Sequence, residues 1–143
     1  MMSGSPASGT AGVRIIAIED RGDTRGLFFF APRDAVDFLG DIKDVRAGTS
    51  KPGAVRGNNF NIVNRQAVIV IHESEWTLFW DSGEGTSPCH LSFQGIGAEL
   101  VLVNPGCARA IQNTGDMDIV LVELSDAPYR ADDVRRRVLC EPD

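Results

Sequence analysis

The sequence predicts an all-β fold in a single domain, a barrel or sandwich with little helix. Short apolar runs separated by turn residues recur at intervals of about 8–12 residues, which is typical of strands joined by short connections. The chain has 143 residues, about the length of one domain, and 43% of them are hydrophobic, so one core can form. We therefore expect one compact unit of packed strands.

The N-terminal half alternates strand and turn signals. Residues 13–18, VRIIAI, predict a first strand, and residues 27–32, LFFFAP, predict a second that ends at Pro32. Residues 34–44 have apolar spacing compatible with one short helix. Residues 46–59, RAGTSKPGAVRGNN, predict a polar, glycine-rich bend.

The C-terminal half begins with the strongest strand signal. Residues 67–71, AVIVI, and 76–80, WTLFW, predict a hairpin, with His72 exposed at its tip. Further strands are expected in HLSF, ELVLV and DIVLVELS, and a short solvated helix from Arg130. The expected organisation is a flexible leader at 1–12, a barrel at 13–128 and a charged tail at 129–143.

Charge and cysteine content narrow the choice of partner and compartment. The net charge of −6 repels phosphate backbones and anionic lipids, so we expect a small-molecule partner and neither nucleic acid nor membrane. Three cysteines without paired spacing predict reduced thiols in a cytoplasmic protein. No secretory signal or membrane-spanning run is apparent in the sequence.

Three motifs occur in the order found in one known family. Residues 51–66 read KPGAVRGNNFNIVNRQ, residues 104–113 read NPGCARAIQN, and Asp23, Arg25, Gly26 and Phe28 form a D-x-R-G-x-F pattern. Together they resemble the cupin superfamily, in the branch of nucleotide-sugar epimerases, ketoisomerases and capsular-polysaccharide reductase/epimerase cupin domains. The resemblance implies a jelly-roll-type cupin β-barrel and a homodimer paired through N-terminal strands.

The chain departs from the family at the positions of the metal ligands. Asn59, Asn61, Gln66 and Arg109 stand where the resemblance places two histidines, a glutamate and a third histidine. Amides and a guanidinium are unsuited to a divalent transition metal, so we expect no metal and no cofactor. The four side chains either satisfy one another in the interior or bind a ligand, and Arg109 would then suit a carboxylate, enolate or phosphate oxygen.

Aromatic and histidine side chains supply further candidates. Trp76, Leu78 and Trp80 share one strand face, either as packing or as the wall of an apolar pocket. His90 is either structural or, if it points inward, a general base. The remaining candidates are substrate contacts: Arg56, which could equally form a structural salt bridge, and Ile111, both by match to the family motifs, and Phe28, which shares a face with Phe30.

These features favour a metal- and cofactor-independent isomerase or cyclase of secondary metabolism. In its sharpest form the hypothesis is ring closure or cycloaddition of a polyketide-like intermediate, held by Arg109, Asn59, Asn61 and Gln66. The alternative is a nucleotide-deoxysugar epimerase or ketoisomerase, as the family resemblance implies. A second alternative is a cupin that binds a small molecule without catalysis.

Overall fold

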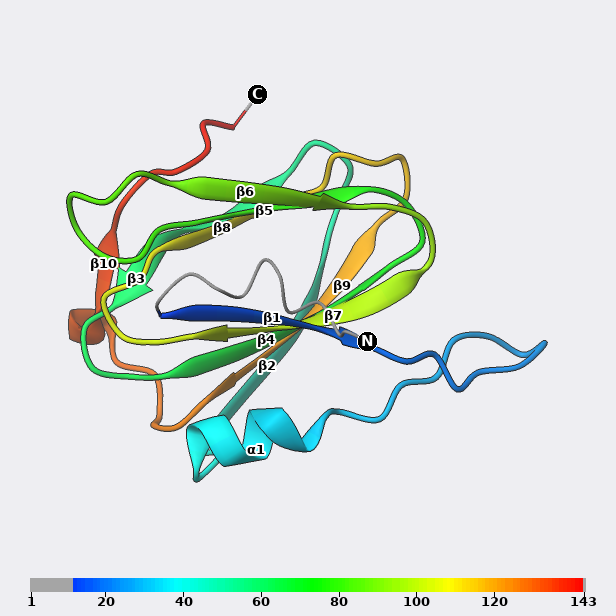
Figure 1. Cartoon of the computed structure of the whole chain (residues 1–143), viewed down its shortest axis with the longest axis horizontal. Coiled ribbons are helices and arrows are strands. Elements are labelled where there is room, and N and C mark those ends of the chain that lie inside the picture. Colours follow the sequence, from blue (N-terminus) through cyan, green and yellow to red (C-terminus); the bar gives the residue numbers. More distant parts are fainter. Residues whose placement is uncertain (1–11, 143) are drawn as a thin grey trace.

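Two antiparallel five-stranded sheets pack face to face in the computed structural model, which describes residues 12–142 (Figure 1). The strand orders are β1-β7-β4-β9-β2 and β10-β3-β8-β5-β6, and the predicted all-β class is confirmed. In chain order the elements are β1 (Val13–Ile18), α1 (Arg33–Leu39), β2 (Asp44–Ser50), β3 (Val55–Asn61), β4 (Gln66–His72), β5 (Trp76–Trp80), β6 (Cys89–Phe93), β7 (Gly97–Val103), β8 (Arg109–Gln112), β9 (Ile119–Ser125), a 3₁₀ helix (Ala131–Asp133) and β10 (Val134–Arg136).

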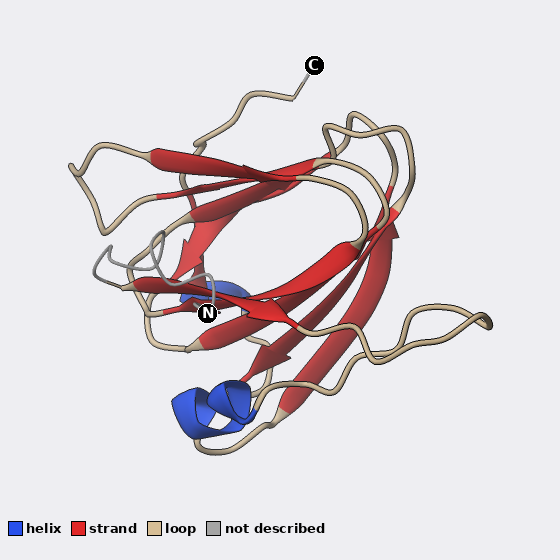
Figure 2. Ribbon diagram, turned by 45° about the vertical axis from the view of Figure 1, so that its right-hand side comes forward, coloured by secondary structure: helices blue, strands red, loops and turns tan. Residues whose placement is uncertain are grey.

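The main core lies between the two sheets. Alternate residues of each strand point inward, so Val68 and Val70 of β4 meet Leu78 of β5 across the barrel interior. The other face of the first sheet is covered by α1, where Leu39 packs over the second core. Strand β7 is buried on both faces, which explains why ELVLV reads as a continuous apolar run. Figure 2 shows the helix lying outside the sheet and the space between the sheets enclosed by strands.

Two predictions for the N-terminal half are wrong. Residues 27–32 form no strand; they belong to an arm between β1 and α1 that projects from the body (Figure 1). Residues 46–59 are not a bend but contain most of β2 and the start of β3, because β2 is an edge strand whose exposed positions are polar. The turn itself is confined to residues 51–54.

The predicted tail is built into the second sheet. Only Ala131–Asp133 is helical, as one 3₁₀ turn, and β10 then pairs with β3. Arg137 donates to both carboxylate oxygens of buried Asp81, at 2.8 and 2.9 Å, and its guanidinium stacks over Phe60. The tail therefore closes the open edge of β3 and is part of the folded unit.

The ends and the cysteines add little to this picture. Residues 1–11, which make up nearly all of the predicted leader, lie outside the described residues. Cys89 and Cys107 are free thiols, and Cys140 Sγ donates to Gln112 Oε1 at 3.5 Å. No helix in the described part of the chain is long and apolar enough to cross a membrane.

Candidate functional site

A bulge in β3 brings two of the candidate residues together. Gly57 has φ +105°, and a Cβ there would lie 2.6 Å from the carbonyl oxygen of Arg109, so only glycine fits. Asn58 follows with φ 57°, a left-handed conformation that asparagine tolerates well. The register shifts between Gly57 and Asn59, which leaves Asn59 directly opposite Arg109 of β8.

Arg109 is the central charge of the site. Its side chain is 6% exposed, and its Nη1 donates to Asn59 Oδ1 at 3.1 Å. Its Nη2 lies 3.9 Å from Oε1 of Glu123, which reaches it from β9 of the opposite sheet. Burial lowers the pKa of Arg109, and the negative charge of Glu123 opposes that effect. A guanidinium has five N–H donors, so these two contacts leave donors without an acceptor among the described residues.

Two neighbouring polar atoms are also unpaired. Trp80 lies opposite Arg109 in the β5–β8 register, and its buried Nε1 has no hydrogen-bond partner within residues 12–142. Gln66 Nε2 donates to Ser125 Oγ at 3.4 Å, while Gln66 Oε1 is unpaired. Buried polar groups of native proteins are nearly always paired, so unpaired ones gathered at one place point to a ligand. We call Arg109, Asn59, Glu123, Trp80 and Gln66 the arginine cluster.

A cavity of about 200 Å³ opens beside this cluster, between β2, β3 and β9. Arg56 is held at its rim because Nε and Nη2 donate to the carbonyl oxygen of Thr49, at 3.1 and 2.8 Å. Arg46 opposes Glu123 in the β2–β9 register and stacks on Tyr129, 4.1 Å from the ring centroid. Together the lining residues are Arg46, Ala47, Gly48, Arg56, Leu121 and Glu123.

The side chain of Asn61 contacts the C-terminal segment and not the other predicted site residues. Its Nδ2 donates to Asp133 Oδ2 at 3.0 Å, and Asp133 also accepts from the backbone N–H groups of Val63 and Asn64. Burial by itself would raise the pKa of Asp133, but these hydrogen bonds outweigh it and lower that pKa. Asn61 therefore anchors the C-terminal segment, and the structure does not join it to the arginine cluster.

The apolar candidates lie in the core. Trp76 and Leu78 are fully buried, and Ile111 opposes Leu78 across the β5–β8 register. All three belong to the main core cluster, so they form packing rather than the wall of an open pocket. Of the predicted aromatic face, only Trp80 contributes a polar atom to the arginine cluster.

Two other candidates lie away from the cluster. His90 is exposed and pairs with Phe79 on the outer face of the second sheet, their ring centroids 5.8 Å apart. Alternate residues of a strand face opposite sides, so the residues directly before and after His90 face inward. His90 itself lacks the inward position that a general base would need. Phe28 is 58% exposed on the projecting arm, edge-on to Phe30.

His72, which we expected in solvent, is buried. Its Nε2 lies 2.8 Å from Glu99 Oε1, its Nδ1 lies 2.8 Å from the carbonyl oxygen of Gly95, and Glu99 Oε1 also accepts from Trp76 Nε1 at 3.0 Å. His72 ends β4 on the inward face, so the hairpin turn begins only after it. We call His72, Glu99 and Trp76 the histidine cluster; it lies at the opposite end of β4 from Gln66.

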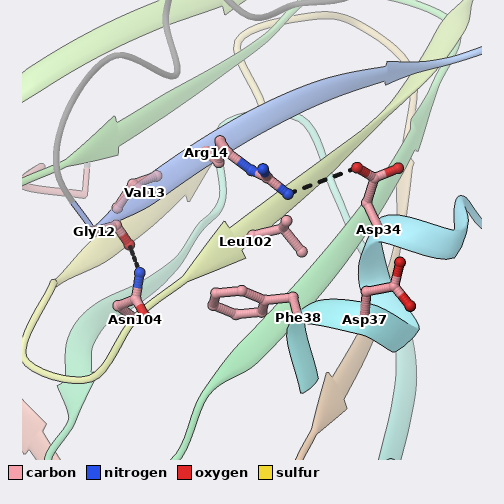
Figure 3. A pocket seen from close by; sticks show the side chains of 8 residues that line it. All are labelled: Gly12, Val13, Arg14, Asp34, Asp37, Phe38, Leu102 and Asn104. Atoms are coloured by element: carbon pink, nitrogen blue, oxygen red, sulfur yellow. Dashed lines mark hydrogen bonds and ion pairs between the residues drawn. The ribbon is translucent and has the colours of Figure 1, made fainter. Parts of the chain in front are cut away.

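A larger cavity, of about 510 Å³, lies on the outer face of the first sheet beside α1 (Figure 3). Arg14 points across it toward Asp34, and their charged atoms are 3.6 Å apart with both side chains about half exposed. An ion pair this exposed contributes little energy. None of the predicted site residues lines this cavity.

The side chains at the positions where the family resemblance places metal ligands do not fit a transition metal. Two of the four side chains present amides already bonded to Asp133 and Ser125, and Arg109 presents only N–H donors. Within the described residues, no group of three or more His, Cys, Asp or Glu side chains could hold a metal ion.

Glu123 is the functional candidate that sequence reasoning missed. In the run IVLVELS, Ile119 and Leu121 face the interior, so a period of two places Glu123 there as well. A charged residue at an inward position of a buried strand is a signal of a binding or catalytic site. That signal was available in the sequence.

The fold of this chain is similar to that of several solved sugar epimerases and isomerases. NovW, a 4-keto-6-deoxy sugar epimerase from Streptomyces spheroides, has a TM-score of 0.69 at 20% identity, covering 90% of this chain and 70% of that one. A mutant of the 3,4-ketoisomerase QdtA from Thermoanaerobacterium thermosaccharolyticum, in complex with TDP-4-keto-6-deoxyglucose, has a TM-score of 0.67 at 19% identity, with 88% of both chains covered.

A third structure, a dTDP sugar isomerase from Desulfovibrio desulfuricans, has a TM-score of 0.72 at 14% identity, covering 87% of this chain and 83% of that one. No protein-family model and no curated protein sequence matches the chain. The predicted jelly-roll-type cupin fold is confirmed.

Proposed function

We propose that this protein is a ketoisomerase that acts on a nucleotide-activated keto sugar without a metal ion. The observation that carries the proposal is Arg109, a buried guanidinium whose unused donors lie beside Trp80 and next to an open cavity. Isomerisation next to a carbonyl develops negative charge on the carbonyl oxygen, and fixed donors in a water-poor site stabilise such a charge best. Arg109 and Trp80 would supply those donors, with Asn59 holding the guanidinium in place.

The substrate class is inferred from the fold neighbours and the charges at the cavity rim. NovW is a 4-keto-6-deoxy sugar epimerase, the Desulfovibrio protein is a dTDP sugar isomerase, and the QdtA mutant, which matches this chain over 88% of both lengths, was solved with TDP-4-keto-6-deoxyglucose. A cavity of about 200 Å³ is smaller than the roughly 300–1,000 Å³ of most ligand pockets, so it suits one ring rather than a whole nucleotide. Arg46 and Arg56 at the rim would then meet the diphosphate.

The cyclase hypothesis receives less support. Folding a polyketide-like chain needs a large apolar cavity, and the aromatic face that suggested one is packed: Trp76 and Leu78 are both 0% exposed. A protein that only binds its ligand remains the other outcome of the test below.

The test is turnover of TDP-4-keto-6-deoxyglucose in D₂O, followed by NMR. We expect deuterium to enter the carbon next to the carbonyl and a new keto sugar to accumulate, faster than in a sample without protein. Stabilisation of the protein by TDP without exchange or product would indicate a binding protein. The absence of both would overturn the proposed function.

We also propose the homodimer through N-terminal strands. Its support is the projecting arm, on which Phe28 and Phe30 are 58% and 57% exposed, and the unpaired edge of β2, with Val45 61% exposed. Sedimentation analysis of the wild type against a Phe28→Ser, Phe30→Ser variant should show a dimer that weakens on substitution.

A further inference from the structure

We propose that Glu123 is the general base of the reaction, the group that removes a proton from the carbon next to the substrate carbonyl. This inference rests on the proposed function and names a catalytic residue for it. Glu123 lines the cavity with its side chain 29% exposed, and no hydrogen bond to its carboxylate occurs within the described residues. Apart from the ion pair of Oε1 with Arg109 at 3.9 Å, its oxygens keep their acceptor capacity for a substrate.

The histidines are excluded from this role by their positions. The chain contains two. His72 is buried in the histidine cluster, at the other end of the barrel, with both ring nitrogens engaged. His90 lies on the outer face of the second sheet. Neither can reach the cavity beside Arg109.

The other residues around the cavity cannot accept a proton from carbon. Arg46 and Arg56 remain cationic, and Ala47, Gly48 and Leu121 carry no basic group. Asn59 and Gln66 are neutral amides without useful basicity. Among residues 12–142, Glu123 is the one proton acceptor in the lining of this cavity.

The position of Glu123 relative to Arg109 suits removal of a proton by the carboxylate and stabilisation of the carbonyl oxygen by the guanidinium. Its Oε1 lies 3.9 Å from Arg109 Nη2. When the substrate carbon that loses the proton lies beside the carboxylate, the carbonyl oxygen of the next substrate carbon therefore lies near the guanidinium. One side chain comes from β9 of the first sheet and the other from β8 of the second, so the substrate would lie between the sheets. A base must lie within hydrogen-bonding reach of the proton that it removes, and the open cavity permits this approach.

The proposed step conserves all atoms and electrons. The Glu123 carboxylate takes the proton, the C–H electron pair becomes a C=C bond, and the carbonyl π pair moves to the oxygen as an enolate held by Arg109. The proton of the adjacent hydroxyl passes to that oxygen, and Glu123 returns its proton to the former carbonyl carbon. The carbonyl has then moved by one carbon, and no oxidant or reductant is needed.

The test compares Glu123→Gln with Asp118→Asn in the D₂O assay. Both remove one carboxylate charge, but Asp118 is exposed just before β9 and is not among the residues that line the cavity. We expect Glu123→Gln to lose about 10²–10⁴-fold in exchange rate, the usual contribution of a general base, while its affinity for TDP stays within about twofold of the wild type. Asp118→Asn should exchange at the wild-type rate.

The outcomes separate the two proposals. Equal exchange by Glu123→Gln and the wild type overturns the role of Glu123 and leaves the proposed function standing. If the wild type exchanges no deuterium, the proposed function fails and this inference fails with it. Should Glu123→Gln not fold, Glu123→Asp keeps the charge but withdraws it by one methylene, and a rate equal to that of the wild type would again overturn the inference.

Discussion

The barrel interior holds two polar clusters that differ in how fully their hydrogen-bonding groups are used. In the histidine cluster both ring nitrogens of His72, the indole N–H of Trp76 and one oxygen of Glu99 are all engaged, at 2.8–3.0 Å. In the arginine cluster Trp80 Nε1 and Gln66 Oε1 are unpaired, and the shortest contact of Arg109 to Glu123 is 3.9 Å.

The contrast separates a structural role from a functional one. A buried network in which every member is paired stabilises and specifies a fold. Unpaired buried polar groups destabilise it, and they are expected mainly at functional sites. Both clusters contain a tryptophan of β5 and a basic side chain paired with a glutamate of another strand, a neighbouring strand for His72 and a strand of the opposite sheet for Arg109. They can therefore be compared by matched substitutions.

Replacing Arg109 by Met should have the largest effect, and it should fall on activity. Loss of a fixed donor to a developing oxyanion costs about 10²–10³-fold in kcat. The free energy of unfolding should change by less than about 1 kcal/mol, because an apolar side chain of similar size replaces a poorly paired buried charge, and Glu123, 29% exposed and 3.9 Å away, keeps its contact with solvent. Keto-sugar turnover and urea denaturation measure the two quantities. A variant that is active but unstable would assign Arg109 to the structural group.

Replacing His72 by Phe should affect stability instead. The change leaves the buried carboxylate of Glu99 without its cation, which typically costs about 3–5 kcal/mol. The double variant His72→Phe, Glu99→Leu should recover much of that loss, because no charge is then left unpaired. Urea denaturation checks both variants, and the folded fraction should keep its turnover rate. Full stability in the single variant would contradict the role given to the histidine cluster.

The two tryptophans of β5 offer a smaller, matched comparison. Trp76→Phe removes a hydrogen bond to Glu99, whereas Trp80→Phe removes an N–H that has no partner. Because hydrogen bonds to charged groups contribute about 1.5–3 kcal/mol, Trp76→Phe should be less stable than Trp80→Phe by about that amount. Equal unfolding free energies would mean that the two indole groups are equivalent.

The smallest expected effect is a dependence of stability on pH. Burial opposes the charge on His72, but the hydrogen bond and negative charge of Glu99 and the carbonyl of Gly95 outweigh it, so the pKa of His72 is raised above its ordinary 6.5. The contribution of His72 to the stability of the fold is therefore complete below pH 6.5. It is lost as the pH rises through the raised pKa that His72 has in the folded state. Thermal unfolding between pH 5 and pH 9 should show this decline in the wild type. It should be absent from His72→Phe.

Much of the fold was predictable because its signals are local. The runs at 67–71, 76–80 and 99–103 alternate or continue as apolar strands, and the structure has β4, β5 and β7 there. Predictions failed where burial was one-sided or lacking: β2 is polar because it is an edge strand, and residues 27–32 are apolar but have no strand beside them. Pairing depends on neighbours that a local pattern does not contain.

The candidate site was predictable in part. Asn59, Gln66 and Arg109 were singled out from motif positions; the structure joins Asn59 to Arg109 by a hydrogen bond and places Gln66 on the strand paired with the one that carries Glu123. Asn61 was singled out on the same grounds, but its partner Asp133 lies 72 residues away, in a segment that we expected to be a solvated tail. Glu123 was overlooked because no motif marks it.

The sequence by itself determined the all-β class and which residues of a strand share a face, since these follow from side-chain type and a period of two. It also fixed the amides and the guanidinium at Asn59, Asn61, Gln66 and Arg109, a donor set unsuited to a transition metal. Only the tertiary structure decided which polar groups meet. Glu123 reaches Arg109 from the opposite sheet, and His72 finds Glu99 across a neighbouring strand. Such contacts depend on sheet order and register, which bring distant residues within a few ångströms and which no local pattern encodes.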